Sequence, residues 1–283
     1  MKHKTPKISS IEKALDILMA FTHHNHERGT AELSQKLGFP PATVNRILQI
    51  LSQKGLLQQN ERTRKFSLGS ATFQLGKTIF QSLSGNLLNM AMPHLVDLCE
   101  KVGETVVLEV LSGKYSVVTY IAQSRHALSI GPRIGDRVPV HAAAGAKAML
   151  AFFQQEEIAG FLDTKMRSFT PKTITDLGTL RRELEKARKE GVAFCQEEMA
   201  LGVNAIGAPI FDHENKPVAA VVIAGLASRV KCDVGSPMIT PLKKTASDIS
   251  AQFFHQTSMD IQDQILKSEN KPTGDFLNGK ARA

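Results

Sequence analysis

The chain has 283 residues, a formal net charge of +8, 42% hydrophobic residues and three cysteines. This length favours two domains, and no apolar run approaches the ~18–20 residues of a membrane-spanning helix. Residues 1–10 lack the apolar segment of a signal peptide, and the spacing of Cys99, Cys195 and Cys232 fits neither a zinc site nor a disulfide framework. We therefore expect a cytoplasmic protein with no metal, no cofactor and no membrane partner.

The excess positive charge is concentrated near the N-terminus. Residues 1–68 hold 11 Lys and Arg against 5 Asp and Glu, a net +6, whereas the remaining residues have a net +2. A domain with this excess attracts a phosphate backbone through counterion release. Lys2, Lys4 and Lys7 form a basic arm, which either touches DNA or remains a free terminus.

The first predicted helix covers residues 11–21, and a serine just before it can cap its start. Its apolar spacing predicts a core face formed by Ile11, Leu15, Leu18 and Phe21. The His-His-Asn-His stretch at residues 23–26 is interpreted as a polar loop, because no second cluster of metal ligands accompanies it.

The next segment has the layout of a winged helix-turn-helix. A short helix over residues 31–37 is followed by a break at 38–41 and a longer helix over 42–54, which ends at Gly55. The basic segment from Gln58 to Lys65 then returns into Phe66-Ser67-Leu68 as a β wing. This order makes DNA the first partner to consider.

The longer helix has one apolar stripe and one polar face. The stripe falls at i, i+3, i+4 and i+7 and consists of Val44, Ile47, Leu48 and Leu51. The polar residues outside it are Thr43, Asn45, Arg46 and Gln49. Their hydroxyl, amide and guanidinium groups can read base edges in a major groove. A solvated face is the alternative for an isolated helix, but the preceding turn and the following wing favour DNA binding.

The rest of the chain predicts a helical linker and an α+β domain. Two helical pieces are expected over 70–82 and 87–101, with a bend near Pro93 and apolar side chains that pack within the chain or on a partner chain (Phe73, Ile79, Phe80, Leu83 and Leu87). The expected strands are 105–111, 115–122, 128–130, 203–209 and 218–225. The expected helices are 141–153, 180–190 and 247–254. A mixture of this kind indicates a central antiparallel sheet.

These patterns predict four segments. A DNA-binding domain covers 1–68, a linker 69–102 and an α+β domain 103–255, and a polar tail over 256–283 is expected to be poorly ordered.

Several motifs, in this order, resemble the IclR type of bacterial transcriptional regulator over residues 9–254. They are residues 11–18, Pro41-Ala42-Thr43-Val44-Asn45-Arg46, Gly103-Glu104-Thr105-Val106, the run from Gly135 to Ala142, Gly202-Val203, and the run from Ala208 to Asp212. No single motif is decisive, and their order and spacing carry the match.

The resemblance implies a winged helix-turn-helix head, a helical linker and a GAF-like effector-binding domain. Such proteins bind double-stranded operator DNA as homodimers or dimers of dimers, and a small organic or aromatic acid changes their DNA affinity. The candidate DNA-binding residues are then Thr30, Pro41, Ala42, Thr43, Asn45, Arg46, Gln49, Arg62, Arg64 and Lys65.

The resemblance also implies an effector pocket between the sheet and the loop that leads into the Ala-rich helix. Its candidate lining is Leu108, Leu128, His141, Ala144, Gly145, Ala146, Cys195, Val203, Ala205, Val222 and Ala224.

The positions of Cys195, Ala205, Val222 and Ala224 hold Asp, Cys, Ser and Ser in several family members. We therefore expect a less polar pocket, which suits an acid with an apolar or aromatic body better than glyoxylate or pyruvate. Backbone N–H groups around residues 144–146 are expected to hold the carboxylate. A pocket that is closed, with these positions as plain sheet core, is the alternative.

Two other classes of function stay open. One is a DNA-binding protein whose C-terminal domain binds no ligand and only oligomerises. The other, less favoured, is an enzyme with an accessory basic domain. His141 and the pair Glu197-Glu198 carry titratable groups, but the sequence has no phosphate loop, nucleophile elbow or metal-ligand cluster.

Overall fold

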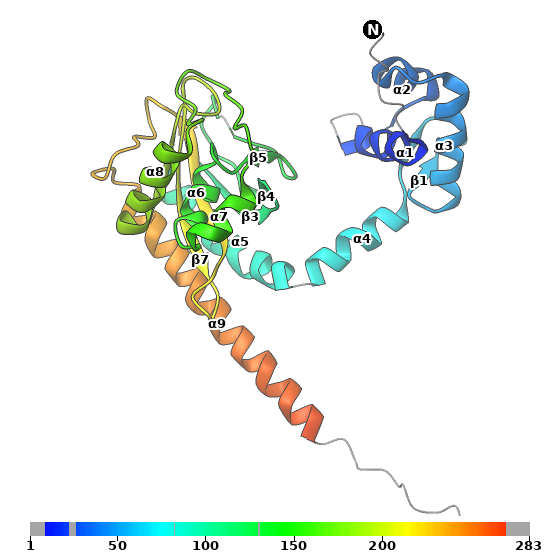
Figure 1. The fold of residues 1–283 in the computed structure, drawn as a ribbon. Helices are drawn as coiled ribbons and strands as arrows, with labels where there is room; N and C mark the ends of the chain where they lie inside the picture. The colour runs from blue at the N-terminus through cyan, green and yellow to red at the C-terminus, as the bar shows by residue number, and fades with distance from the viewer. Residues whose placement is uncertain (1–8, 23–26, 82, 130, 270–283) are drawn as a thin grey trace, which may run out of the picture. The chain divides into compact units, whose positions relative to one another are not determined.

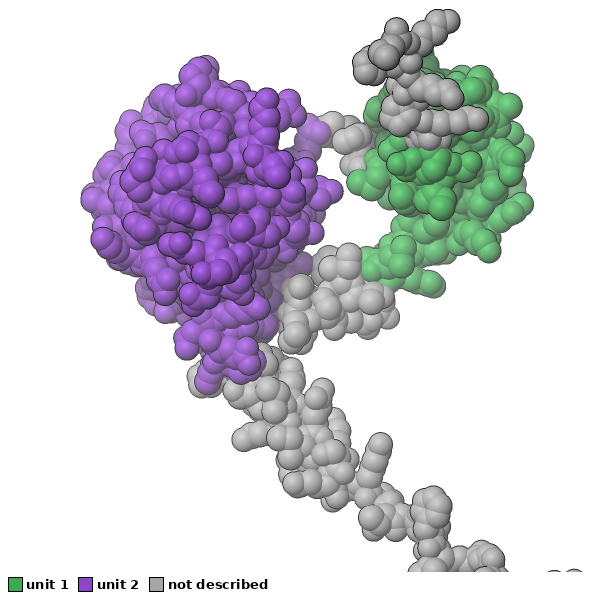
Figure 2. All heavy atoms as spheres, viewed as in Figure 1, with its two compact units in different colours: residues 1–85 green, residues 86–283 purple. Residues whose placement is uncertain are grey.

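The structure is a computed structural model that describes residues 9–22, 27–81, 83–129 and 131–269. The chain divides into two compact units, residues 1–85 and 86–283 (Figure 2). The basic arm with Lys2, Lys4 and Lys7, and the histidine-rich stretch at 23–26, lie outside the described residues.

The first unit is a helix-turn-helix with a two-stranded wing (Figure 1). Its elements are α1 (Ser10–Met19), a 3-10 turn (Ala20–Thr22), α2 (Thr30–Leu37), α3 (Pro41–Gln53), β1 (Leu57–Gln59), β2 (Phe66–Leu68) and α4 (Ser70–Gln81). Ser9 caps α1 as predicted, and the Glu12 side chain completes a capping box. Gly38 ends α2 at φ 69°, a left-handed conformation that glycine adopts without strain. Pro41 then begins α3, where a missing N–H leaves no helical bond unmade.

The core of this unit confirms the α3 stripe and corrects the α1 face. Val44, Ile47, Leu48 and Leu51 are all buried. In α1, however, Ile17 is fully buried while Ile11 is 74% and Leu15 is 55% exposed. The prediction is confirmed for Phe21, which is 2% exposed, and for Leu18, which packs against the core, but it was wrong for Ile11 and Leu15. Ile17, four residues before Phe21, is the residue that points into the core with it. Ile11 and Leu15 lie instead on a surface groove between α1 and α3.

The second unit is built on one antiparallel sheet with the strand order β5-β4-β3-β8-β7-β6. The strands are β3 (Thr105–Ser112), β4 (Tyr115–Ala122), β5 (Arg137–Pro139), β6 (Ala193–Gln196), β7 (Val203–Phe211) and β8 (Pro217–Leu226). The helices are α6 (Ala144–Leu150), α7 (Gln155–Phe161), α8 (Leu177–Glu190) and α9 (Ile239–Glu269). Helix α5 (Leu83–Val102) begins at the end of the first unit and contains Pro93. The α+β class with a central antiparallel sheet is confirmed.

Helices cover both faces of this sheet, as alternation along the strands requires. Val106 and Leu108 pack with residues of α5 and α9 on one face. Val107 lies on the other face, with Ala144 and Met149 of α6. Behind α6, a further apolar cluster joins it to α7 and α8.

Three local predictions are corrected. The strand expected at 128–130 is absent among its described residues, and Leu128 lies in a bend at 63% exposure. Helix α6 spans only seven residues, starting at Ala144 rather than at residue 141. Helix α9 continues to Glu269, so the prediction of an irregular tail from residue 256 was wrong up to residue 269. For Leu87, which is buried in the sheet core, the alternative of packing within the chain is confirmed.

Candidate nucleic-acid interface and effector site

Helix α3 presents its polar residues to solvent. Asn45, Arg46 and Gln49 are exposed, and none of their side chains bonds to another described residue. The apolar stripe on the opposite side of α3 packs in the core and holds the helix in place. The polar side chains therefore stay available for contacts with DNA. Thr43 is half-buried and lines the groove between α1 and α3 with Arg46.

The turn before α3 is fixed by a side chain. Ser34 donates a hydrogen bond from Oγ to the carbonyl oxygen of Phe39 at 2.6 Å. Pro40 caps α3 in an extended conformation, and Pro41 and Ala42 follow at its exposed start. Thr30 opens α2 after Gly29. Thr30, Pro41 and Ala42 therefore lie at helix N-termini, where backbone N–H groups favour phosphate.

The wing is a short, tightly turned hairpin. Leu57 pairs with Leu68, and Gln59 pairs with Phe66. The Asn60 side-chain oxygen accepts from the N–H groups of Arg62 at 3.0 Å and of Thr63 at 3.2 Å.

Around this turn the basic side chains Arg62, Arg64 and Lys65 are all exposed. Arg64 has φ 57°. The arrangement can meet a phosphate backbone with three cations.

A buried arginine ties the wing to the helices, and the sequence pattern gave no sign of it. Arg28 is 7% exposed and donates from Nε to the carbonyl oxygen of Ala20 at 2.9 Å. Its guanidinium also pairs with Glu32, and its backbone bridges to Phe66 in β2. This arginine is structural, since it is buried and its Nε and Nη1 atoms already donate within the first unit.

The structure brings only part of the predicted effector lining together. Ala144, Cys195 and Val222 share the buried cluster on the α6 face of the sheet, and Ala205 packs against it. Ala224 pairs with Ala205 between adjacent strands. Gly145 lies close to Val222, because a Cβ atom on Gly145 would be 2.9 Å from its methyl group.

Other members of the predicted lining lie elsewhere. Leu108 faces the opposite side of the sheet, among residues of α5 and α9. Ala146 packs toward α8, and Val203 is half-buried at the start of β7. Leu128 is exposed, and its carbonyl oxygen accepts from Arg229 at 3.2 Å.

His141 is a structural residue by its contacts. It is 3% exposed, its Nε2 lies 2.9 Å from the carbonyl oxygen of Arg167, and its ring stacks on Phe169. It thereby fastens the chain before α6 to the segment before α8.

A buried carboxyl group stands where the effector carboxylate was expected. Glu109 is 6% exposed, and its Oε2 accepts a hydrogen bond from Ser116 Oγ at 2.6 Å. The same oxygen would collide with a Cβ atom on Gly145, so it fills the space at the start of α6. Burial raises the pKa of Glu109, and the Ser116 hydrogen bond only partly opposes this.

A second polar group lies beside Cys195. Lys147 Nζ is 2.5 Å from Glu198 Oε1, and the two side chains are 2% and 6% exposed. Burial raises the pKa of the Cys195 thiol, an effect that Lys147 opposes. The surroundings of Cys195 are therefore more polar than the four substituted positions suggested. Period-two alternation in β3 could have placed Glu109 on this face, whereas no sequence signal pairs residues 147 and 198.

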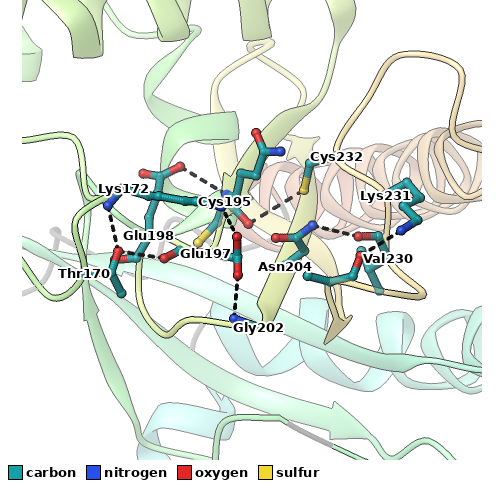
Figure 3. A network of polar contacts seen from close by, with 12 residues as sticks. Thr170, Lys172, Cys195, Glu197, Glu198, Gly202, Asn204, Val230, Lys231 and Cys232 are labelled. Atoms are coloured by element: carbon teal, nitrogen blue, oxygen red, sulfur yellow. Dashed lines mark hydrogen bonds and ion pairs between the residues drawn. The ribbon is translucent and has the colours of Figure 1, made fainter.

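The pair Glu197-Glu198 splits into two roles, and Figure 3 shows the loop that holds it. The Glu197 side chain forms an ion pair with Lys172 and accepts from the Gly202 N–H at 2.7 Å. Lys172 and Gly202 lower the pKa of Glu197, whereas burial raises that of Glu198 more than Lys147 lowers it. The two carboxylates face different partners, so they do not form a catalytic pair.

Cavities of the described residues lie beside other elements. The larger ones are lined by α7 and α8, by α5 and β4, and by α1 and α3. Within the described ranges, no group of three or more His, Cys, Asp or Glu is arranged to hold a metal ion. None of the helices described there has the length and apolarity that a bilayer crossing requires.

Comparisons with known proteins agree on the family. Residues 10–61 match the IclR helix-turn-helix domain, and residues 81–251 match the bacterial transcriptional regulator IclR C-terminal domain. The transcriptional repressor IclR of Escherichia coli K12 is 30% identical over 252 residues, covering 88% of this chain and 91% of that protein. The chain belongs to the IclR family of bacterial transcriptional regulators, which bind DNA through the helix-turn-helix.

Solved structures agree with this assignment. Thermotoga maritima IclR has a TM-score of 0.70 and 28% identity, covering 86% of this chain and 98% of that one. An IclR homologue from Microbacterium hydrocarbonoxydans, crystallised with 4-hydroxybenzoate, has a TM-score of 0.71 at 22% identity, with 87% and 99% covered. The second likeness concerns the fold alone.

Proposed function

We propose that this protein is a transcriptional repressor that reads operator DNA with α3 and responds to a small organic acid. The observation that carries the DNA part is the exposed, unpaired face of Asn45, Arg46 and Gln49 above a fully anchored stripe. The basic wing at Arg62, Arg64 and Lys65 supplies phosphate contacts beside it. Thr30, Pro41, Ala42 and Thr43 complete the proposed interface.

We also propose that the protein acts as a homodimer or as a dimer of dimers. Two heads related by two-fold symmetry would read half-sites about one helical turn apart. Support comes from apolar side chains that the described residues leave uncovered, with Phe73 of α4 75% exposed. Binding to an operator would place the protein at the nucleoid of the cytoplasm.

The proposed effector is an organic acid with an apolar or aromatic body, bound in the C-terminal unit. The α6 face supports the body of such a ligand, because Ala144, Cys195, Ala205 and Val222 gather there. The start of α6 does not support a site for its carboxylate, since Glu109 already fills that space. A relative of the same fold was crystallised with 4-hydroxybenzoate, which belongs to this ligand class.

An operator titration tests the proposal. Fluorescence anisotropy would compare the full chain on the intergenic DNA beside its gene with a scrambled duplex, at two salt concentrations. We expect tight, sequence-selective binding that benzoate or 4-hydroxybenzoate weakens and that glyoxylate and pyruvate leave unchanged. Selective binding insensitive to all four acids would contradict the effector part and favour a body that only oligomerises. Failure to bind any duplex at low salt would contradict the repressor itself.

A further inference from the structure

A large cavity in the described part of the second unit lies away from the α6 face. It has a volume of about 880 Å³, is open to solvent on one side and is lined by α7, by the segment 162–168 and by the start of α8. Pockets that bind small molecules typically have volumes of about 300–1,000 Å³. This cavity therefore has room for a ligand of two fused rings.

The floor of the cavity is apolar. Ile158 of α7 is 8% exposed and belongs to the cluster that joins α6, α7 and α8. Leu162 and Met166 are half-buried and pack against the same cluster, and Leu177 lines the cavity from the start of α8. An apolar ring system placed there would remove these side chains from water, which is favourable.

The cavity is lined by three cationic and two acidic side chains, so its net charge is positive. The two lining carboxylates already have partners: Asp163 forms an ion pair with Lys114 at 2.9 Å, and Asp176 accepts from the Thr179 N–H at 2.7 Å.

Three lining cations remain, Lys165, Arg167 and Arg181, and no described carboxylate forms an ion pair with them. Arg167 stands over the Phe169 ring at 5.2 Å. An anion at the rim therefore meets cations without first displacing an acid.

We propose that this cavity is a binding site for an organic anion with an apolar body, with Lys165 and Arg181 at the charged group. Ile158, Leu162, Met166 and Leu177 would hold the body. The site goes beyond the proposed function, because it shares no residue with the α6-facing surface and stands whether or not operator binding responds to it. It is connected to that surface through Arg167, whose carbonyl oxygen bonds to His141 just before α6.

Isothermal titration calorimetry on the full chain tests the site, with 2-naphthoate as the probe and 2-naphthylmethanol as its uncharged counterpart. We expect saturable 2-naphthoate binding that includes one site per chain at this cavity, and much weaker binding of the alcohol to that site. The charge reversals Arg181→Glu and Lys165→Glu should each weaken 2-naphthoate about five- to tenfold, an amount typical of a partly shielded ion pair. Lys186→Glu is the matched control, because it makes the same charge change on α8 away from the cavity. It should retain nearly the wild-type affinity.

A steric variant separates the cavity from general charge effects. Ala159 is exposed on α7 and lines the cavity, so Ala159→Trp should fill the space without disturbing the core and should abolish 2-naphthoate binding at this site. Equal affinity in wild type, Arg181→Glu and Ala159→Trp would overturn the proposal, as would no saturable binding by the wild type. DNA is not part of this readout, so failure of the site and failure of operator regulation remain distinguishable.

Discussion

Lys147 Nζ and Glu198 Oε1 lie 2.5 Å apart in the interior of the second unit. The pair joins α6 to the loop after β6, and Gln196 adds its N–H to the same oxygen at 3.3 Å. Glu198 Oε2 has no hydrogen-bond partner among the described residues. A charge pair with an incomplete set of hydrogen bonds gives little net stability, but either partner alone would be a buried, uncompensated charge.

Removing one partner should therefore be far more damaging than removing both. We expect Lys147→Met to lower the free energy of unfolding by about 3–5 kcal/mol, and Lys147→Met with Glu198→Leu to recover most of that loss. Urea denaturation of both variants measures this, with the exposed Lys186→Met as a control that should stay within about 0.5 kcal/mol. A double variant no more stable than the single one would contradict the account.

The buried Glu109 predicts a pH dependence whose sign follows from its raised pKa. The folded chain holds the Glu109 proton more tightly than the unfolded chain does, so protonated Glu109 stabilises the folded state at low pH. It is lost as the pH rises through the folded pKa. Glu109→Gln should consequently be more stable than wild type at pH 8, by about 1–3 kcal/mol, with no gain near pH 4.

Denaturation midpoints at pH 4, 6 and 8 check this, with the exposed turn residue changed by Glu214→Gln as the control. A gain from Glu109→Gln that is independent of pH would mean that folding does not raise the pKa of Glu109, which would contradict this account.

The backbone of α6 lies directly on β7 at Gly207. A Cβ atom there would be 2.7 Å from the carbonyl carbon and oxygen of Ala144, and backbone cannot give way as a side chain end can. Gly207→Ala should destabilise the fold by about 1–3 kcal/mol. Gly160→Ala in α7 meets nothing within 4 Å and should stabilise by about 0.5–1 kcal/mol. Thermal unfolding of the two variants should shift in opposite directions, and shifts of the same sign would refute the close contact.

The corrected α1 face gives a prediction for the head. Ile17 is fully buried, so Ile17→Ala should reduce stability by about 2–5 kcal/mol. Leu15 is 55% exposed, so Leu15→Ala should change the stability of the head by less than about 1 kcal/mol. Denaturation followed by far-ultraviolet circular dichroism would reveal the ranking. Similar losses in both variants would mean that Leu15 is covered, for example by a second chain.

Sequence periodicity was sufficient for elements whose residues have one clear inward face. The α3 stripe follows directly from the spacing of its apolar residues. The wing and most sheet strands follow from β-rich runs that are bounded by turn residues. In α1 the same rule failed, since apolar residues occupy more than one face and only tertiary packing selects Ile17. The strand expected at Leu128 failed because a short apolar run forms a strand only where a neighbour supplies hydrogen bonds.

The effector face was harder to predict for a different reason. A list of positions carried over from a family says which residues lie near a pocket, but not what neighbouring side chains do to its volume. Glu109 fills the start of α6, and Lys147 reaches Glu198 across 51 residues of sequence. Such long-range polar contacts leave no periodic signal, and the same holds for the cavity between α7 and α8.

The central claim is that α3 reads bases, and Arg46→Ala tests it most directly. Anisotropy would be measured on the operator, on operator duplexes with single base-pair changes and on scrambled DNA, with the wing variant Arg62→Ala for comparison. Arg46→Ala should cost about 1–3 kcal/mol on the operator and relax specificity at one base pair, with scrambled DNA nearly unaffected. Arg62→Ala should weaken all duplexes alike and reduce the salt dependence. Equal losses on operator and scrambled DNA for Arg46→Ala, or no loss at all, would contradict base reading by α3.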